Sequence, residues 1–185
     1  MGTGLIILLV VIAILVIWLI AAYNGFIKAK NNCEESYSTM DVYLKKRFDL
    51  IPNLVETVKG YASHEKETFE KITEARSMVQ NATNDADKLK GENMLTGTLR
   101  SLFAVAENYP ELKANQNFLD LQDQLKQVEL DIANARKYYN AVVKIFNNKV
   151  EMFPSNIIAK LFHFEKKPMF EVENEEERQN VKVQF

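Results

Sequence analysis

Cysteine and histidine are scarce in this chain of 185 residues, which limits the chemistry it can support. Cys33 is the single cysteine, so an intrachain disulfide and a zinc site made of several thiolates are both excluded. Neither His64 nor His163 follows a Glu by three positions, the spacing that carboxylate-bridged metal pairs in helical bundles require. Position 68, where a zinc-protease motif starting at His64 would place its second histidine, is Thr68. We therefore expect no metal and no cofactor.

Glycine, proline and excess charge are also sparse. Six Gly and four Pro leave few points at which a helix must end, which favours an all-helical fold. Lys plus Arg number 23 and Asp plus Glu 25, so the chain lacks the basic excess typical of nucleic-acid-binding proteins. The sequence also contains no Gly-rich phosphate loop, nucleophile elbow or Ser/His/Asp arrangement. These absences predict a protein that is not an enzyme and does not bind nucleic acid.

The chain does contain one long apolar run, which starts at Leu5 and ends at Ala22. As a helix this run would span about 27 Å, close to the thickness of the hydrocarbon layer of a bilayer. Trp18 and Tyr23 lie near its far end, where aromatic rings favour the membrane interface. A cleaved signal peptide is the alternative, but the run is too long for one and no Lys or Arg precedes it. We predict that residues 1–23 form a single-pass transmembrane anchor in contact with the lipid bilayer.

The charges around the anchor indicate its orientation. Lys28 and Lys30 follow the apolar run, whereas only the amine of Met1 precedes it. The positive-inside bias then places the N-terminus outside the cell and the rest of the chain in the cytoplasm. A domain exported behind an uncleaved anchor is the alternative, which digestion by protease from outside intact cells would establish.

The spacing of apolar residues predicts two long helices. Residues 115–153 contain no Gly or Pro and place apolar side chains at intervals of three and four, along one stripe of a helix about 57 Å long. Such a stripe requires a partner of similar length, which residues 23–59 provide as a continuation of the anchor. Pro52 predicts a kink or short break there, with Asp49 capping the restarted helix.

Two shorter helices are predicted between the long ones. They cover residues 65–82 and 89–109, with a loop at residues 81–88 and an end at Pro110. Asn115 is expected to cap the last helix by accepting a hydrogen bond from a backbone N–H about three residues later. These lengths predict an all-α fold: an antiparallel four-helix bundle with long first and last helices, preceded by one N-terminal transmembrane helix. The bundle domain would cover residues 24–170.

The C-terminal region has two interpretations. Residues 154–170 combine large apolar side chains with Lys160, Lys166 and Lys167, a composition typical of an amphipathic segment at a bilayer surface. Alternatively, this segment covers the exposed flank of the long helices near the membrane. Residues 171–185 are rich in Glu and Asn and are predicted to form an acidic, disordered tail.

Several charged and polar residues lie beside the apolar stripes rather than opposite them. We expect a structural polar network that fixes the helix register, with a functional polar groove as the alternative. Arg136 is expected to pair with Glu107 or Glu65, and the cluster of Lys45, Lys46 and Arg47 is expected to be a solvated or salt-bridged face. The candidates for the network are Arg47, Asp49, His64, Glu65, Arg76, Glu107, Arg136 and Asn140.

Several blocks of the sequence resemble the LemA family. The longest is LKKRFDLIPNLVETVKGYASHE at residues 44–65, and shorter ones are AENYPELKA at 106–114, Ala135-Arg136 with Tyr139-Asn140, and FPSN at 153–156. The resemblance extends from the anchor to Phe170 and leaves the tail out. The family usually has Gly before the Phe at position 164, where this chain has His163. The resemblance implies a bacterial membrane protein with one N-terminal anchor and an antiparallel helical bundle, related to magnetosome-membrane proteins. It implies no established enzymatic activity and supplies no catalytic residue.

Together these features predict a non-enzymatic scaffold or interaction module in the bacterial cell membrane, which presents helix faces or its tail to an unidentified protein partner. Homo-oligomerisation is left open. The alternatives are an enzyme that uses a membrane-proximal polar groove and a transmembrane signalling relay. An interior with paired polar groups would favour the scaffold, whereas an open pocket with converging, unpaired carboxylates would favour the enzyme.

Overall fold

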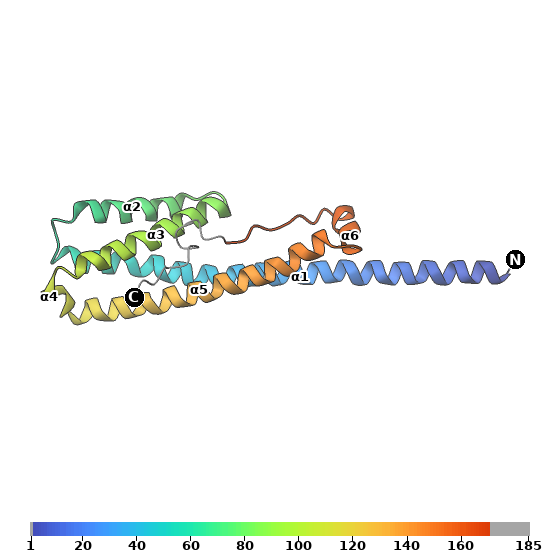
Figure 1. The fold of residues 1–185 in the computed structure, drawn as a ribbon, viewed down its shortest axis with the longest axis horizontal. Helices are drawn as coiled ribbons and strands as arrows, with labels where there is room; N and C mark the ends of the chain where they lie inside the picture. The colour runs from blue at the N-terminus through green and yellow to red at the C-terminus, as the bar shows by residue number, and fades with distance from the viewer. Residues whose placement is uncertain (1, 171–185) are drawn as a thin grey trace, which may run out of the picture. The chain divides into compact units, whose positions relative to one another are not determined.

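The computed structural model describes residues 2–170, apart from the side chains of residues 85 and 86. This part of the chain forms six helices, α1 (Gly2–Lys59), α2 (Lys66–Asn81), α3 (Asp85–Ala106), α4 (Pro110–Lys113), α5 (Gln116–Glu151) and α6 (Ser155–Leu161) (Figure 1). The all-α prediction is confirmed, and the predicted bundle is confirmed in part. The predicted disordered tail, residues 171–185, lies outside the described residues.

Pro52 was predicted to cause a kink or a short break; helix α1 passes through it without a break, so the second alternative is wrong. Asp49 does not cap a new helix; its carboxylate lies 3.0 Å from the Nζ atom of Lys45, one turn earlier. Ile51 and Leu54, on either side of the proline, are fully buried. We infer that packing of these side chains stabilises the helix against the local preference of proline, as tertiary contacts commonly do.

The ends of the later helices follow from local capping. Helix α3 begins inside the predicted loop because Asn84 caps it, with its side chain accepting a hydrogen bond from the N–H of Asp87 at 2.8 Å. Helix α3 ends at Ala106, before the end predicted at Pro110, and Pro110 instead begins the short α4, at the first position where its missing N–H is tolerated. Asn115 accepts a hydrogen bond from the N–H of Phe118 at 3.0 Å, so the predicted cap of α5 is confirmed.

The chain divides into two compact units. Unit 1 comprises residues 1–38 and 136–185, and unit 2 comprises residues 39–135. Unit 1 therefore contains the first part of α1, the last part of α5 and α6, whereas unit 2 contains the remaining parts of α1 and α5 with α2, α3 and α4. The domain limits expected from the sequence, at residues 23 and 170, stay a prediction.

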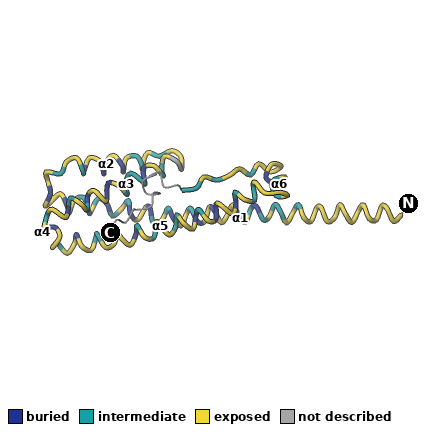
Figure 2. Tube along the Cα trace, viewed as in Figure 1, coloured by how far each residue is buried: buried dark blue, intermediate teal, exposed yellow. Residues whose placement is uncertain are grey.

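Unit 2 has one apolar core to which all of its helices contribute. Buried positions lie on the sides of α1, α2 and α3 that face one another (Figure 2). Helices α2 and α3 approach closely because Gly91 has no side chain: a Cβ atom there would lie 3.0 Å from the backbone nitrogen of Val79. The buried core comprises Ile51, Leu54, Val58, Ala62, Phe69, Ile72, Ala75, Leu95, Leu99, Leu102, Ala106, Leu112, Phe118 and Leu125.

Unit 1 packs the first part of α1 against the last part of α5 and adds α6 and the chain that follows it. Aromatic rings form much of the contact: the ring of Phe164 stacks on Phe26 at 4.7 Å between centroids, and Phe146 meets Phe26 edge-on at 6.2 Å. The buried core comprises Phe26, Ala29, Cys33, Tyr139, Val142, Val143, Phe146, Ile158 and Ala159.

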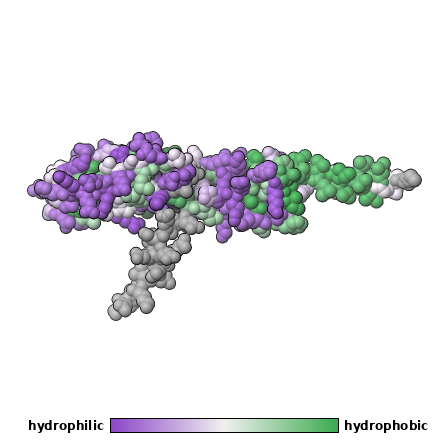
Figure 3. Space-filling model, turned by 90° about the horizontal axis from the view of Figure 1, so that it is seen from above, coloured by the Kyte–Doolittle hydropathy of each residue, from purple (hydrophilic) through white to green (hydrophobic). Residues whose placement is uncertain are grey.

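The beginning of α1 is long and apolar enough to cross a membrane, by length and composition. Its side chains are exposed in the structure, with Leu5 at 59% and Ile17 at 67% of full exposure (Figure 2). The face seen in Figure 3 carries hydrophobic residues along this part of the helix. The same helix continues into the cores without interruption, as the sequence predicted.

Candidate functional site

Arg47 is fully buried in unit 2, although its guanidinium carries a positive charge. Of the solvated or salt-bridged face expected for residues 45–47, Arg47 takes the salt-bridged alternative, but in the interior of unit 2 rather than on its surface. Because a helix turns about 100° per residue, Lys45 and Lys46 face solvent while Arg47 points inward. Its spacing between Leu44 and Ile51, three and four residues away, is the sequence signal that places it within the apolar stripe.

The guanidinium of Arg47 joins α1, α3 and α5. Its Nη2 atom forms an ion pair with the carboxylate of Glu92, which is 2% exposed, and donates to the backbone oxygen of Glu92 at 3.1 Å. Its Nη1 atom donates to Glu129 at 2.7 Å and to the hydroxyl of Thr96 at 2.6 Å. Neither carboxylate was a candidate from the sequence, because their pairing depends on how three helices pack. This cluster pairs one buried cation with two carboxylates, as a structural ion-pair network does.

Two other candidates in unit 2 contact aromatic side chains. The guanidinium of Arg76 lies 4.4 Å from the ring centroid of Phe48, a cation–π contact. Glu65 accepts a hydrogen bond from the hydroxyl of Tyr109 at 3.2 Å. Burial raises the pKa of Tyr109 above its usual value, and the Glu65 carboxylate raises it further. Both contacts tie α2 to neighbouring segments of unit 2.

The remaining candidates in unit 2 lie on its surface. Asp49 pairs with Lys45, Glu107 pairs with Lys113, and His64 is exposed. Exposed ion pairs of this kind contribute about 1 kcal/mol or less to stability. The structure therefore distributes the unit 2 candidates over separate contacts, and among them Arg47 forms a deeply buried ion pair.

Arg136 and Asn140 lie in unit 1, where both contact Phe170. The guanidinium of Arg136 lies 5.6 Å from the ring centroid of Phe170, and Asn140 forms hydrogen bonds with the backbone of that residue. The predicted pairing of Arg136 with Glu107 or Glu65 stays a prediction.

Two asparagines of α5 hold the extended chain that follows α6. We call Asn140 and Asn147 the asparagine clamp and residues 163–170 the strap. The side chain of Asn140 donates to the oxygen of Phe170 and accepts from its N–H, both at 2.8 Å. The side chain of Asn147 forms the same two bonds with Lys167, both at 2.9 Å. Seven residues separate the asparagines, roughly two helical turns, so both face the strap. Asn147 was missed, although this spacing from Asn140 is visible in the sequence.

The strap begins with a left-handed turn at His163, whose φ is 56°. Glycine adopts this conformation readily and other residues do so at a cost. The N–H of Phe164 donates to the oxygen of Ala159 at 2.9 Å and so closes the end of α6. Histidine therefore retains the turn that glycine would form.

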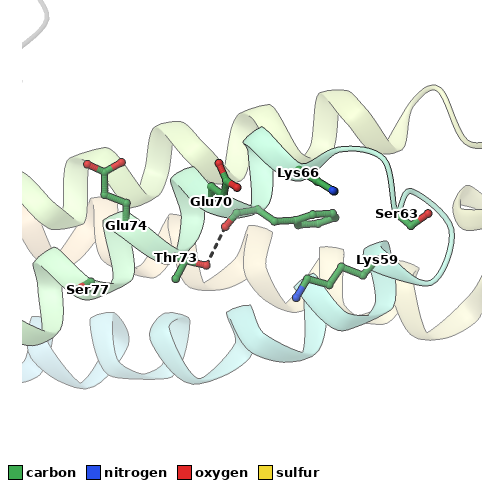
Figure 4. Close-up of a pocket in the computed structure, with 8 residues that line it drawn as sticks. Lys59, Ser63, Lys66, Glu70, Thr73, Glu74 and Ser77 are labelled. Atoms are coloured by element: carbon green, nitrogen blue, oxygen red, sulfur yellow. Dashed lines mark hydrogen bonds between the residues drawn. The ribbon is translucent and has the colours of Figure 1, made fainter.

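A separate open groove of about 690 Å³ lies between the end of α1 and the start of α2 (Figure 4). Glu70 and Glu74 occupy successive turns of α2 and point away from Lys59 on the opposite side. The hydroxyl of Thr73 donates to the backbone oxygen of Phe69 at 2.9 Å, so it is engaged within the helix. Within residues 2–170, no group of three or more His, Cys, Asp or Glu side chains is arranged to hold a metal ion.

Comparison with known proteins places this geometry in a family. The LemA family profile matches residues 36–185, so the prediction that the resemblance ends at Phe170 is wrong. Protein LemA from Metamycoplasma hominis is 29% identical over 142 residues, which cover 74% of this chain and 63% of that protein. Magnetosome protein MamQ 2 from Paramagnetospirillum magneticum is 23% identical over 202 residues, which cover 92% of this chain and 74% of that protein. Magnetosome protein MamQ from Magnetospirillum gryphiswaldense is 22% identical with the same coverage. Because the LemA family profile matches well over half of the residues of this chain, the chain belongs to the LemA family.

Proposed function

We propose that this protein is a membrane-tethered helical interaction module without catalytic activity. The observation that carries the proposal is the continuity of α1, in which an exposed apolar run leads directly into the helix that forms both cores. Exposing apolar surface to water is unfavourable by about 25 cal/mol per Å², whereas a bilayer accommodates it. The fold thus presents a helical domain beside a segment suited to lipid.

The buried polar groups favour a scaffold over an enzyme. Glu92 and Glu129 are held by Arg47, and a carboxylate that acts as a general acid or base must instead reach a substrate proton. The open groove near Lys59 lacks converging carboxylates. A signalling relay is the second candidate, favoured by the single helix that continues from the apolar run into the cores.

The end of α5 and α6 provide a second contact with the membrane in this proposal. Ile158 and Ala159 are buried in the core of unit 1, as expected of a segment that covers the long helices. In this proposal, the exposed face of the same segment contacts the bilayer surface. The ring centroids of Phe162 and Tyr23 lie 4.7 Å apart, and Tyr23 directly follows the apolar run. In this proposal, that contact keeps the exposed face of α6 beside the end of the membrane-spanning segment. The exposed face, which we call the α6 rim, comprises Met152, Phe153, Ile157, Leu161 and Phe162.

We propose that the chain after the anchor, residues 24–170, lies on the cytoplasmic side of the membrane, with the N-terminus outside. Lys28 and Lys30 follow the anchor, and Lys160 of α6 is exposed in the same unit. Lysines beside the end of an anchor favour the cytoplasmic side. Digestion of the domain by protease added to intact cells would contradict this orientation, whereas digestion only after lysis would support it.

Quenching by brominated lipids tests the anchor and the rim in the full chain reconstituted into vesicles. Trp18 is the single tryptophan, so its fluorescence in the wild type reports on the anchor alone. In a Trp18→Phe background, Phe153→Trp places a reporter on the rim, and Tyr138→Trp places a control reporter on an exposed position of α5. We expect quenching of Trp18 and of the reporter at 153 but not of the reporter at 138. An unquenched Trp18 would contradict the anchor, and equal quenching at 153 and 138 would contradict the rim.

Crosslinking in native membranes tests the interaction role. We expect a defined protein to be crosslinked to the helical domain in reproducible amounts. Recovery of the chain with lipid alone, over a range of crosslinker lengths, would count against an interaction module.

A further inference from the structure

The strap is held mainly through its backbone. The asparagine clamp engages both the N–H and the C=O of Lys167 and of Phe170, and the hydroxyl of Tyr139 donates to the oxygen of Pro168 at 3.2 Å. Every peptide carries these backbone groups except the N–H of proline, so such contacts do not depend on side-chain identity. Recognition through the main chain of an extended segment is one established way in which proteins bind peptides.

The side chains of the strap add two aromatic anchors. Phe164 stacks on Phe26, and Phe170 meets Tyr139 edge-on at 5.1 Å between centroids. Between these anchors, Glu165 and Lys166 are exposed, and Lys166 forms an exposed ion pair with Glu151 of α5 at 2.7 Å. The surface therefore accepts an extended segment with aromatic residues six positions apart and tolerates polar residues between them.

The turn at His163, the first residue of the strap, favours release of the strap. His163 is held at a φ of 56°, where a non-glycine residue is strained, and detachment of the strap removes that strain. Lys167 adds only a distant, partly exposed contact with Glu34, at 3.9 Å. The closed strap thus combines specific backbone contacts with a weak point at its start.

We propose that the surface formed by the asparagine clamp, Phe26 and Tyr139 is a binding site for an extended peptide segment of a partner protein, and that the strap is its intramolecular occupant. The partner segment carries aromatic residues six positions apart. This inference rests on the proposed role as an interaction module and names the site and the chemistry of its partner. Because a tethered strap competes at an effective concentration on the order of millimolar, a partner binds only when it displaces the strap or when the strap is weakened.

A labelled peptide with the sequence of residues 163–170 serves as the probe, with the full-length protein in lipid nanodiscs. The double variant Phe164→Ala/Phe170→Ala weakens the intramolecular strap and leaves the clamp intact. We expect this variant to bind the probe at least about tenfold more tightly than the wild type does, as measured by fluorescence anisotropy. Adding Asn147→Ala should abolish the gain, whereas Asn148→Ala, an exposed neighbour on α5, should preserve it.

N-methylated probes test the clamp without any further substitution in the protein. Misfolding therefore cannot explain a difference in affinity between two probes. N-methylation of the probe at the amides of Lys167 and Phe170 removes the two N–H groups that the clamp accepts, and should weaken binding at least about tenfold. N-methylation at Lys166 and Met169 should leave the affinity within about twofold. Equal affinity of the two methylated probes, or no binding of the unmodified probe to the weakened-strap variant, would overturn the proposal. These results concern the peptide site alone: the proposed interaction module is still supported if crosslinking captures a partner. If crosslinking captures no partner, the interaction module itself is contradicted.

Discussion

The two units of this protein hold their segments together by different means. Unit 2 joins three helices through the buried guanidinium of Arg47, which contacts Glu92, Glu129 and Thr96. Unit 1 holds the strap through asparagine side chains that bond to its backbone. The first arrangement depends on particular side chains at every position, whereas the second combines main-chain hydrogen bonds with two aromatic anchors, Phe164 and Phe170.

This difference has an energetic consequence. Removing one partner of a buried ion pair destabilises a protein by about 3–5 kcal/mol, whereas a neutral hydrogen bond contributes about 0.5–1.5 kcal/mol. Asn140 and Asn147 are also only partly buried, so water can replace the strap at lower cost. We expect unit 2 to stay closed while the strap of unit 1 opens locally.

The largest expected effect is at Arg47. Arg47→Met should destabilise unit 2 by about 3–5 kcal/mol, because it leaves the Glu92 carboxylate buried without a cation. Lys45→Met, two residues away, removes only the exposed pair with Asp49 and should cost at most about 1 kcal/mol. Denaturant unfolding followed by circular dichroism measures both. A loss at Arg47 no larger than at Lys45 would break the comparison between the units.

A second prediction concerns the close approach of α2 and α3. Gly91→Ala should destabilise unit 2 by about 1–3 kcal/mol, because its Cβ would lie 3.0 Å from the backbone of Val79. Gly97 lies on the same helix with open space beside it, so Gly97→Ala should stabilise the helix by about 0.5–1 kcal/mol. Thermal unfolding measures both variants. A lower Tm for Gly91→Ala together with a higher Tm for Gly97→Ala would support the tight packing of α2 against α3. A change of Tm in the same direction for both variants would contradict it.

Cys33 reports on the closure of unit 1. Its thiol is 1% exposed in the core against which Phe164 and Phe170 pack, and burial raises its pKa above the usual value. Alkylation should therefore be slow at neutral pH, and its rate should keep rising with pH beyond the range where an ordinary thiol levels off. Changing both clamp asparagines to alanine should accelerate alkylation by about tenfold or more, since it removes hydrogen bonds worth about 1 kcal/mol each.

The matched control for that experiment is Asn148→Ala, which changes an exposed amide on the same helix. It should leave the alkylation rate unchanged. If the clamp variant and this control react at the same rate, the asparagines do not hold the strap closed.

The smallest expected effect is at the start of the strap. His163→Gly should stabilise the closed strap by about 0.5–1 kcal/mol, because glycine adopts the left-handed conformation without strain. Alkylation of Cys33 should then slow by a factor of about two to five. Faster alkylation would show that the flexibility of glycine outweighs the relief of strain.

Local patterns were sufficient to predict α1, α2, α3 and α5 and the apolar run at the start of α1, but not the short helices α4 and α6. The cap at Asn115 was also predictable, because a capping side chain bonds to a backbone N–H only three residues away. Pro52 misled because burial of Ile51 and Leu54 outweighs its local preference. In each case the outcome depended on whether the decisive contact was close in sequence.

The candidate site was less predictable for the same reason. Arg47 was identified as a candidate. Glu92 and Glu129 lie 45 and 82 residues further along the chain and meet Arg47 only when the three helices pack together. Asn140 was also identified, whereas its backbone partner lies 30 residues away and Asn147 was missed. Spacing along one helix can show which residues share a face, but not which segment folds back onto that face.

Amide hydrogen exchange of the full-length protein in nanodiscs tests the central contrast most directly. We expect the amides of Lys167 and Phe170 to be protected, to exchange faster than those of α1 around Arg47, and to lose protection when both clamp asparagines are changed to alanine. Exchange of these two amides at the same rate as the core of unit 2, unaffected by the clamp variants, would contradict the account.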